Sequence, residues 1–191
     1  MSSRTLLQWF TPHVSQQDFF VEPNFDLAQF FYTAETARLL VNALNDYSSP
    51  CCFCTPRLAW EWKQRGREVR LLDYDVRFSV LPGFRHFDVL KPEPINELFD
   101  VVIFDPIFVP AGVLVRAVRA VMAGSPMADL YMTFPIDREE ELLRAFATLS
   151  LKPVDFPLTC CNIKPEYQSL FRLYGSRSDL QFTNQPRTGE D

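Results

Sequence analysis

The order of short apolar runs and amphipathic stretches is the feature that most restricts how this chain can fold. Apolar runs typical of buried strands occupy residues 51–55, 69–73, 84–87, 99–104, 129–134, 154–161 and 169–174. Stretches with helical spacing of apolar residues separate most of them, at residues 33–46, 58–67, 113–122 and 138–149. Strands that alternate with helices form a mostly parallel sheet with helices on both faces. The last two strands follow each other without a helix, which predicts an antiparallel final pair.

Length and composition predict one globular domain. The chain has 191 residues, of which 47% are apolar, and can bury a large core. We expect an N-terminal extension over residues 1–23, the domain over residues 24–175 and a polar tail over residues 176–191. A glycine-rich turn is missing after the first predicted strand, which argues against NAD, FAD and ATP as ligands.

The charged residues and cysteines narrow the class of partner. A formal net charge of -5 argues against binding nucleic acid by bulk electrostatics. Four basic residues gather at Lys63, Arg65, Arg67 and Arg70. We interpret them as the solvated end of a helix. The five cysteines lie in apolar runs without disulfide or zinc-site spacing, so we expect free thiols and no metal.

The apolar runs and the first residues of the chain predict where in the cell the protein is located. No run reaches the ~18–20 apolar residues of a membrane span, so we expect no membrane partner. A cytoplasmic location is expected. An organelle such as the mitochondrion is the alternative, because residues 1–17 contain Arg4 and no acidic residue.

Three predicted strands are each followed by an aspartate: Asp73, Asp88 and Asp105. The C-terminal ends of parallel strands meet at one edge of a sheet, where such folds bind ligands. The first acid is placed to accept hydrogen bonds from ribose hydroxyls, the second from an adenine amino group and the third from a substrate amine. A sugar, a base and an amine are what methylation by S-adenosylmethionine requires. The alternative is that all three acids are solvated strand caps.

The strand at residues 99–104 leads directly into Asp105-Pro106-Ile107-Phe108. The Asp105 carboxylate and the Pro106 carbonyl are adjacent hydrogen-bond acceptors, and Phe108 adds an aromatic face. This pattern matches the Asp/Asn-Pro-Pro-aromatic motif of amino-methyltransferases, except that Ile107 replaces the second proline. The alternative is an ordinary Asp-Pro turn.

Four segments together resemble one family: residues 24–33 (NFDLAQFFYT), 72–78 (LDYDVRF), 99–106 (FDVVIFDP) and 170–174 (LFRLY). This combination is similar to the N6-adenine-methyltransferase-like family that includes the elongation factor 1-alpha lysine methyltransferases. The resemblance covers residues 24–175 and implies a Rossmann-like, S-adenosylmethionine-dependent methyltransferase fold of about seven strands.

The resemblance also implies the roles of the site residues. Those expected at the cofactor S-adenosyl-L-methionine are Gln29, Phe31, Thr33, Thr55, Asp73, Asp75 and Asp88. The first three would border its methionine end, Asp73 and Asp75 its ribose and Asp88 its adenine. Thr55 lies in a segment similar to the family branch that methylates ribosomal RNA adenines. Those expected at the substrate amine are Asp105, Pro106 and Phe108.

The activity implied by the resemblance is S-adenosylmethionine-dependent N-methylation of an amino group. A lysine of a protein such as a translation factor is the expected substrate, because the chain is acidic and has no RNA-binding module. Two alternatives stay open. One is N6-methylation of adenine in RNA, with Phe108 stacked on a flipped base. The other is an inactive scaffold in a ribonucleoprotein assembly, motivated by Ile107 and the glycine-poor first loop.

Overall fold

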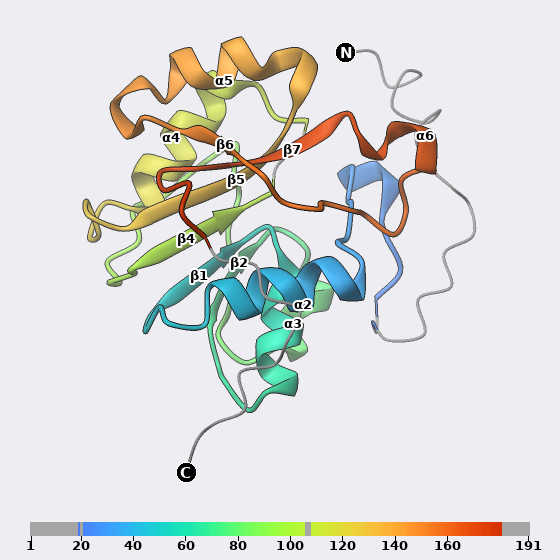
Figure 1. Ribbon diagram of the computed structural model, residues 1–191. Coiled ribbons are helices and arrows are strands. Elements are labelled where there is room, and N and C mark those ends of the chain that lie inside the picture. The colour runs from blue at the N-terminus through green and yellow to red at the C-terminus, as the bar shows by residue number, and fades with distance from the viewer. Residues whose placement is uncertain (1–18, 20, 106–107, 181–191) are drawn as a thin grey trace.

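One seven-stranded sheet forms the centre of the molecule in the part of the chain that the structure describes (Figure 1). The structure is a computed structural model and describes residues 19, 21–105 and 108–180. The strands are β1 (Pro50–Phe53), β2 (Arg70–Asp73), β3 (Phe84–His86), β4 (Val101–Phe104), β5 (Asp129–Pro135), β6 (Lys152–Val154) and β7 (Phe171–Gly175). The helices are α2 (Ala34–Ala43), α3 (Pro56–Gln64), α4 (Ala111–Val121), α5 (Glu139–Ala145) and α6 (Pro165–Gln168). Short 3-10 turns are η1 (Phe25–Leu27), η2 (Val76–Val80), η3 (Ile136–Arg138) and η4 (Ala147–Leu149).

The strand order is β3-β2-β1-β4-β5-β7-β6. The five strands from β3 to β5 are parallel, and β7 is antiparallel to both of its neighbours. This confirms the predicted Rossmann-like fold with seven strands and an antiparallel final pair. The chain order reverses between β1 and β4, and parallel sheets bind ligands outside the strand ends at such a reversal.

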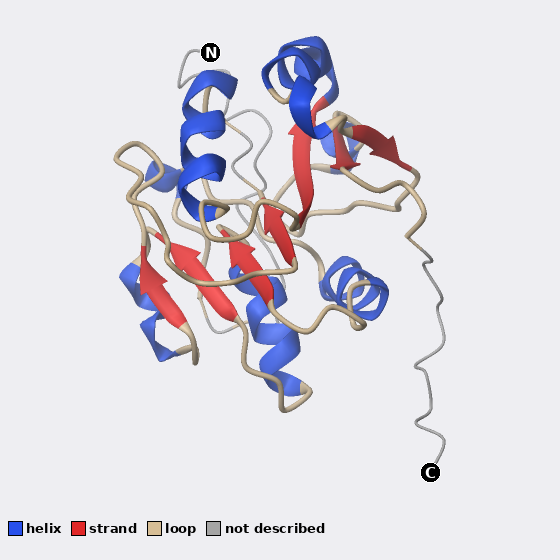
Figure 2. Cartoon of the chain, turned by 90° about the vertical axis from the view of Figure 1, so that its left-hand side faces the viewer, coloured by secondary structure: helices blue, strands red, loops and turns tan. Residues whose placement is uncertain are grey.

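Helices cover both faces of the sheet, with α2 and α3 on one face and α4 and α5 on the other (Figures 1 and 2). Successive side chains of a strand point to opposite faces. In β4, Val101 and Ile103 therefore join the core beneath α2 and α3, whereas Val102 and Phe104 join the core beneath α4 and α5. Each core fixes the sheet from one side, so the strand ends are held rigidly at the edge where ligands bind.

The predicted strand over residues 154–161 is wrong. Strand β6 ends at Val154, and the chain then leaves the sheet. Pro157 has no N–H to donate to a strand ladder, which disfavours continued pairing. The segment runs instead to the residues before α2, where Cys160 forms an isolated antiparallel bridge with Tyr32.

Two predicted helices differ from the observed ones at their ends. Helix α3 begins at Pro56, two residues earlier than predicted, because proline is well suited to the first turn of a helix. The helix predicted over residues 138–149 is divided into α5 and η4 and stops at Ser150, whose φ is 50°. The short helix α6 was not predicted.

Candidate active site

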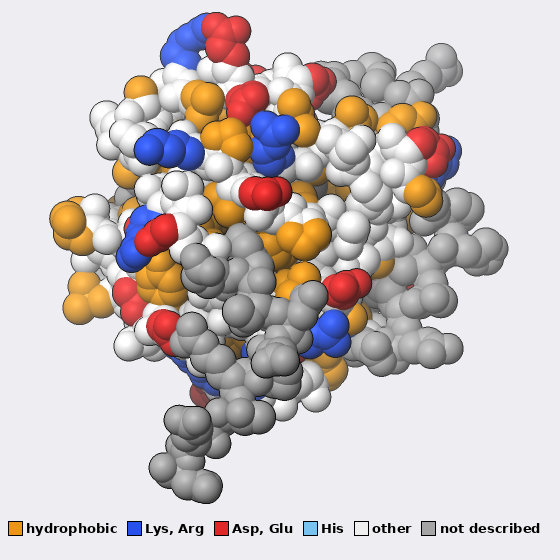
Figure 3. Space-filling model, viewed as in Figure 1, with side chains coloured by type: hydrophobic (Ala, Val, Ile, Leu, Met, Phe, Trp, Pro, Cys, Tyr) orange, Lys and Arg blue, Asp and Glu red, His pale blue; other side chains and the backbone are white. Residues whose placement is uncertain are grey.

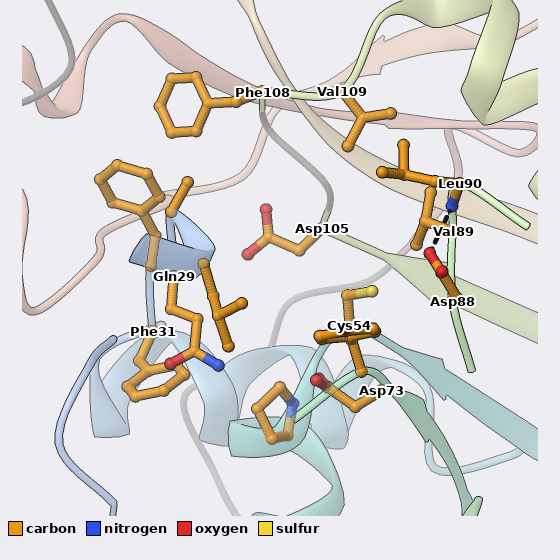
Figure 4. A pocket seen from close by; sticks show the side chains of 15 residues that line it. Gln29, Phe31, Cys54, Asp73, Asp88, Val89, Leu90, Asp105, Phe108 and Val109 are labelled. Atoms are coloured by element: carbon orange, nitrogen blue, oxygen red, sulfur yellow. Dashed lines mark hydrogen bonds between the residues drawn. The ribbon is translucent and has the colours of Figure 1, made fainter. Parts of the chain in front are cut away.

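A cavity of about 410 Å³ opens at the C-terminal ends of the central parallel strands (Figure 4). Six of the predicted site residues line it: Gln29, Phe31, Asp73, Asp88, Asp105 and Phe108. Gln29 and Phe31 come from the segment before α2, and Phe108 precedes α4. Asp73 ends β2, whereas Asp88 and Asp105 follow β3 and β4. The three strand-end carboxyls therefore meet in one cavity, because the parallel register brings those strand ends together.

The Asp105 carboxyl points into the middle of the cavity (Figure 4). Its Oδ1 atom is buried and has no hydrogen-bond partner among the described residues. Burial raises the pKa of Asp105 well above its ordinary value, and a hydrogen bond from Tyr32 opposes that shift. A buried acceptor without a partner is costly for folding, so this atom is a candidate to accept a hydrogen bond from a bound ligand.

Asp73 and Asp88 lie on the opposite wall of the cavity from Phe31 and Gln29 (Figure 4). Asp73 is buried, and its Oδ1 atom accepts a hydrogen bond of 2.9 Å from the Asp75 backbone N–H. Burial raises the pKa of Asp73 to about 7. The Asp88 carboxylate accepts a hydrogen bond of 2.8 Å from the Leu90 N–H. Both side chains keep further acceptor capacity for a ligand.

Cys54 occupies the turn after β1, where a glycine is common in nucleotide-binding folds. Its φ of 54° lies in the left-handed region, and its side chain lines the cavity. The Cys54 N–H donates a hydrogen bond of 2.9 Å to the Leu72 carbonyl, which holds the turn against β2. Sequence reasoning missed this residue because left-handed backbone is uncommon outside glycine. Its position directly after the first strand was the feature of the sequence that could have identified Cys54 as a cavity residue.

Asp75 was predicted beside the ribose, but it does not line the cavity. Its carboxylate forms a 2.6 Å ion pair with Arg77 and accepts a 2.8 Å hydrogen bond from Gln29 Nε2. Although burial opposes the shift, these donors lower the pKa of Asp75. Asp75 thus fixes a side chain of the cavity wall.

Thr33 and Thr55 also lie outside the cavity lining. Thr33 caps α2, where its Oγ1 atom accepts a 3.1 Å hydrogen bond from the Thr36 N–H. Thr55 is buried at the start of α3, and its hydroxyl donates over 3.4 Å to the Ile103 carbonyl. Both positions support neighbouring backbone. Pro106, predicted at the substrate amine, and Ile107 lie outside the described residues.

Asn162 is a residue that sequence reasoning missed. Its fully buried side chain donates a 2.7 Å hydrogen bond to the Gln29 carbonyl and accepts one of 3.0 Å from the Phe31 N–H. It therefore fixes the backbone on both sides of Phe30. An asparagine flanked by Cys161 and Ile163 in an apolar stretch was the available signal.

The cavity wall carries three carboxyl groups and, among the described residues that line it, no lysine, arginine or histidine. Such a wall suits a ligand with positive charge and hydroxyl donors. The described part of the chain holds no group of three or more side chains placed to bind a metal ion. None of the described helices is long and apolar enough to cross a membrane.

Relatives and solved structures show what this chain is similar to. It is 30% identical over 99 residues to EEF1A lysine methyltransferase 1 of Bos taurus, a match that covers 45% of this chain and 44% of that protein. The match thus spans less than half of that curated relative. A crystal structure from Thermoplasma acidophilum is 19% identical, covering 75% of this chain and 85% of the other, with a TM-score of 0.46. A TehB-like SAM-dependent methyltransferase from Corynebacterium glutamicum is 13% identical, covering 74% and 85%, with a TM-score of 0.48.

The family assignment rests on a match that covers most of the chain. The sequence model of the family described as "Probable N6-adenine methyltransferase" matches residues 23–176. That range contains the whole sheet and every described residue that lines the cavity. The chain therefore belongs to the probable N6-adenine methyltransferase family, as its sequence predicted, and its cofactor is S-adenosyl-L-methionine.

Proposed function

We propose that this protein transfers a methyl group from S-adenosyl-L-methionine to the side-chain amine of a protein lysine. The observation that carries the proposal is the buried Asp105 Oδ1 atom, which points into the cavity without a partner among the described residues. An acceptor in this position suits an amine N–H. The relative named for lysine methylation of EEF1A supports an elongation factor 1-alpha-like substrate.

The residues of the cavity divide between the cofactor and the amine. Bound S-adenosyl-L-methionine supplies a methyl group on a positively charged sulfur, which keeps the electron pair when the methyl passes to nitrogen. Asp73 and Asp88 line the cavity. We expect Asp73 to accept hydrogen bonds from ribose hydroxyls and Asp88 from the adenine amino group. Gln29 and Phe31 line the wall expected at the methionine end.

Asp105 aligns the substrate. Its Oδ1 atom accepts a hydrogen bond from the amine, which directs the nitrogen lone pair toward the methyl carbon. The carboxylate also favours the ammonium form of lysine, whereas the apolar surroundings favour the neutral amine that reacts. The Phe30 and Phe108 rings, whose centroids are 5.0 Å apart, exclude water beside Asp105 and support the neutral form. The proton that nitrogen loses leaves to solvent before transfer.

A transfer assay on a cell lysate tests the proposal. We expect tritium from the labelled cofactor to enter protein, to resist nuclease and to be lost on protease treatment. Asp105→Ala removes the acceptor and should lower transfer at least ~100-fold, because misalignment or the loss of one key hydrogen bond typically costs this much. Its cofactor affinity should stay nearly unchanged.

The matched control is Asp179→Ala, which removes an exposed carboxylate paired with Arg177 and should leave transfer unchanged. Label that nuclease removes would favour adenine methylation, the alternative that the family description supports. If wild type labels neither protein nor RNA, the scaffold alternative becomes the better one.

A further inference from the structure

The buried side chain of Tyr32 lies next to Asp105, and no role has been assigned to it above. Tyr32 is 2% exposed, and its hydroxyl lies 2.6 Å from the hydroxyl of Thr133 in β5, which is fully buried. Through this contact the Tyr32 hydroxyl also lies beside the Asp105 carboxyl, within reach of a hydrogen bond. The pairing of Phe104 with Met132 explains this arrangement, because the next step along both strands sets Thr133 beside Asp105.

The protons that Thr133, Tyr32 and Asp105 carry determine which of these groups donates each hydrogen bond. When the Asp105 carboxyl is ionised it only accepts hydrogen bonds, whereas a tyrosine hydroxyl has one proton to donate. If Tyr32 donates to Asp105, its oxygen is left to accept the proton of the Thr133 hydroxyl. The chain of donors then runs from Thr133 to Tyr32 to Asp105, and each buried hydroxyl has a partner.

We propose that Tyr32, oriented by Thr133, is a positioning residue that holds the Asp105 carboxyl with Oδ1 toward the substrate amine. The role is specific to the methyl transfer proposed above and rests on it. The other titratable groups that face Asp105 in the described part of the chain are the thiols of Cys54 and Cys160. Burial raises the pKa of both thiols well above the ordinary value, so they stay neutral.

The backbone around Tyr32 is fixed well enough for such a role. Tyr32 forms an antiparallel bridge with Cys160, and the next residue, Thr33, begins α2 as its cap. On the other side, the Phe31 N–H is bound by the buried Asn162 side chain. A hydroxyl carried on this frame cannot swing away from Asp105 without breaking several buried contacts.

The first test measures the Asp105 carboxyl directly, by carbon-13 NMR titration of aspartate-labelled protein. The Asp105 signal is assigned by its loss in Asp105→Asn. Tyr32→Phe removes one hydroxyl and keeps the ring. We expect the pKa of Asp105 to move upward in Tyr32→Phe, because the donor that opposes the effect of burial is gone. An unchanged Asp105 titration overturns the proposal.

The second readout is kinetic. Tyr32→Phe should lower kcat at least ~10-fold, leave the cofactor Kd within about twofold and move the acidic limb of the pH–rate profile to higher pH. A purely structural role would instead lower the melting temperature and leave that limb in place, which would also overturn the proposal.

Two substitutions of Thr133 provide an independent test of the proposal if Tyr32→Phe fails to fold. Thr133→Val keeps the shape but loses the hydroxyl, and should move the Asp105 titration in the same direction by a smaller step. Thr133→Ser keeps the hydroxyl and should leave the Asp105 titration unchanged. Equal titrations in the two variants overturn the proposal. A wild-type protein that transfers no methyl group would refute the proposed function, whereas the titration would still report on the contact between Tyr32 and Asp105.

Discussion

The Asp73 carboxyl is buried at the end of β2, and its pKa is raised to about 7. It is therefore largely neutral at pH 6 and ionised at pH 8. An ionised carboxylate accepts hydrogen bonds more strongly than a neutral one, so we expect cofactor affinity to increase as the pH rises through about 7. At pH 8, Asp73→Ala should weaken binding by ~1.5–3 kcal/mol. Isothermal titration at both pH values measures this.

Asp73→Asn is the control for the pH effect, because its side chain has the same shape and does not titrate. Its affinity should vary little between pH 6 and pH 8. If the variant kept the pH dependence of wild type, another group would be responsible and our assignment of Asp73 to the ribose would lose its support.

The same group links pH to stability without cofactor. Because folding raises the pKa of Asp73, its contribution to the free energy of unfolding is fully present below the unfolded pKa of ~3.9 and is lost as the pH rises through about 7. We expect Asp73→Asn to lose less stability than wild type between pH 5 and pH 8 in urea unfolding. Parallel stability curves for the two proteins would contradict this.

Single residues were predictable from sequence where strand geometry fixes them. Asp73, Asp88 and Asp105 lie at or just after the ends of parallel strands, so the register brings them to one cavity. Asp75 lies only two residues beyond Asp73, but the turn into η2 directs it to Arg77 and Gln29. The bond from Gln29 joins residues 46 positions apart and leaves no trace in local spacing.

At the scale of elements, the loop that contains Asn162 clamps the segment before α2. Replacing Asn162 by alanine leaves the buried Phe31 N–H without a partner, at a cost of ~1–3 kcal/mol in the free energy of unfolding. Cofactor affinity should fall as well, because Gln29 and Phe31 line the cavity. Denaturant unfolding and isothermal titration of Asn162→Ala measure the two effects.

Asn42→Ala is the matched control. Asn42 lies on α2 and bonds the exposed side of Arg65, so its loss should change stability by less than ~0.5 kcal/mol and leave cofactor binding unchanged. Equal losses in the two asparagine variants would show that the clamp has no special role.

The surroundings of Gly112 and Gly175 predict opposite effects on stability when each glycine is replaced by alanine. A Cβ at Gly112 in α4 would meet nothing within 4 Å, so Gly112→Ala should stabilise the helix by ~0.5–1 kcal/mol. A Cβ at Gly175 would lie 2.6 Å from the Tyr131 ring and 2.5 Å from the Arg177 carbonyl. Gly175→Ala should therefore destabilise by ~1–3 kcal/mol. Calorimetric melting of both variants tests the pair, and a shift of the same sign in each would contradict it.

The elements themselves were predictable where apolar periodicity is strong. The parallel strands and helices α2, α3 and α4 appear within a few residues of the predicted bounds. The predicted strand over residues 154–161 was wrong because its apolar side chains, such as Leu158 and Cys160, pack against the segment before α2 instead of pairing in the sheet. An apolar run shows that a segment is buried but does not show which partner buries it.

At the scale of the whole molecule, charge is mixed. The chain has a formal net charge of -5, and on the face that Figure 3 shows the described Lys and Arg side chains lie among Asp and Glu side chains. Two of the four basic residues predicted at a solvated helix end form ion pairs: Arg65 with Glu61 and Arg70, which lies in β2, with Glu97.

This distribution predicts weak affinity for polyanions. We expect the protein to pass through a heparin column at ~0.15 M salt, because its net charge is negative and the basic side chains on the face in Figure 3 are mixed with acidic ones. Retention that weakens steeply with salt would instead support an RNA substrate. A basic protein of similar size, run on the same column, shows that the resin binds.

The bridge between Tyr32 and Cys160 and the clamp by Asn162 join parts of the chain more than 120 residues apart. Bringing these segments together closes a long loop, which costs chain entropy. We expect such contacts to form late in folding. On the ribosome, which delivers the chain from its N-terminus, β1 to β5 can emerge before this wall of the cavity exists. We therefore expect the nascent chain to bind its methyl donor only after residue 162 has left the exit tunnel.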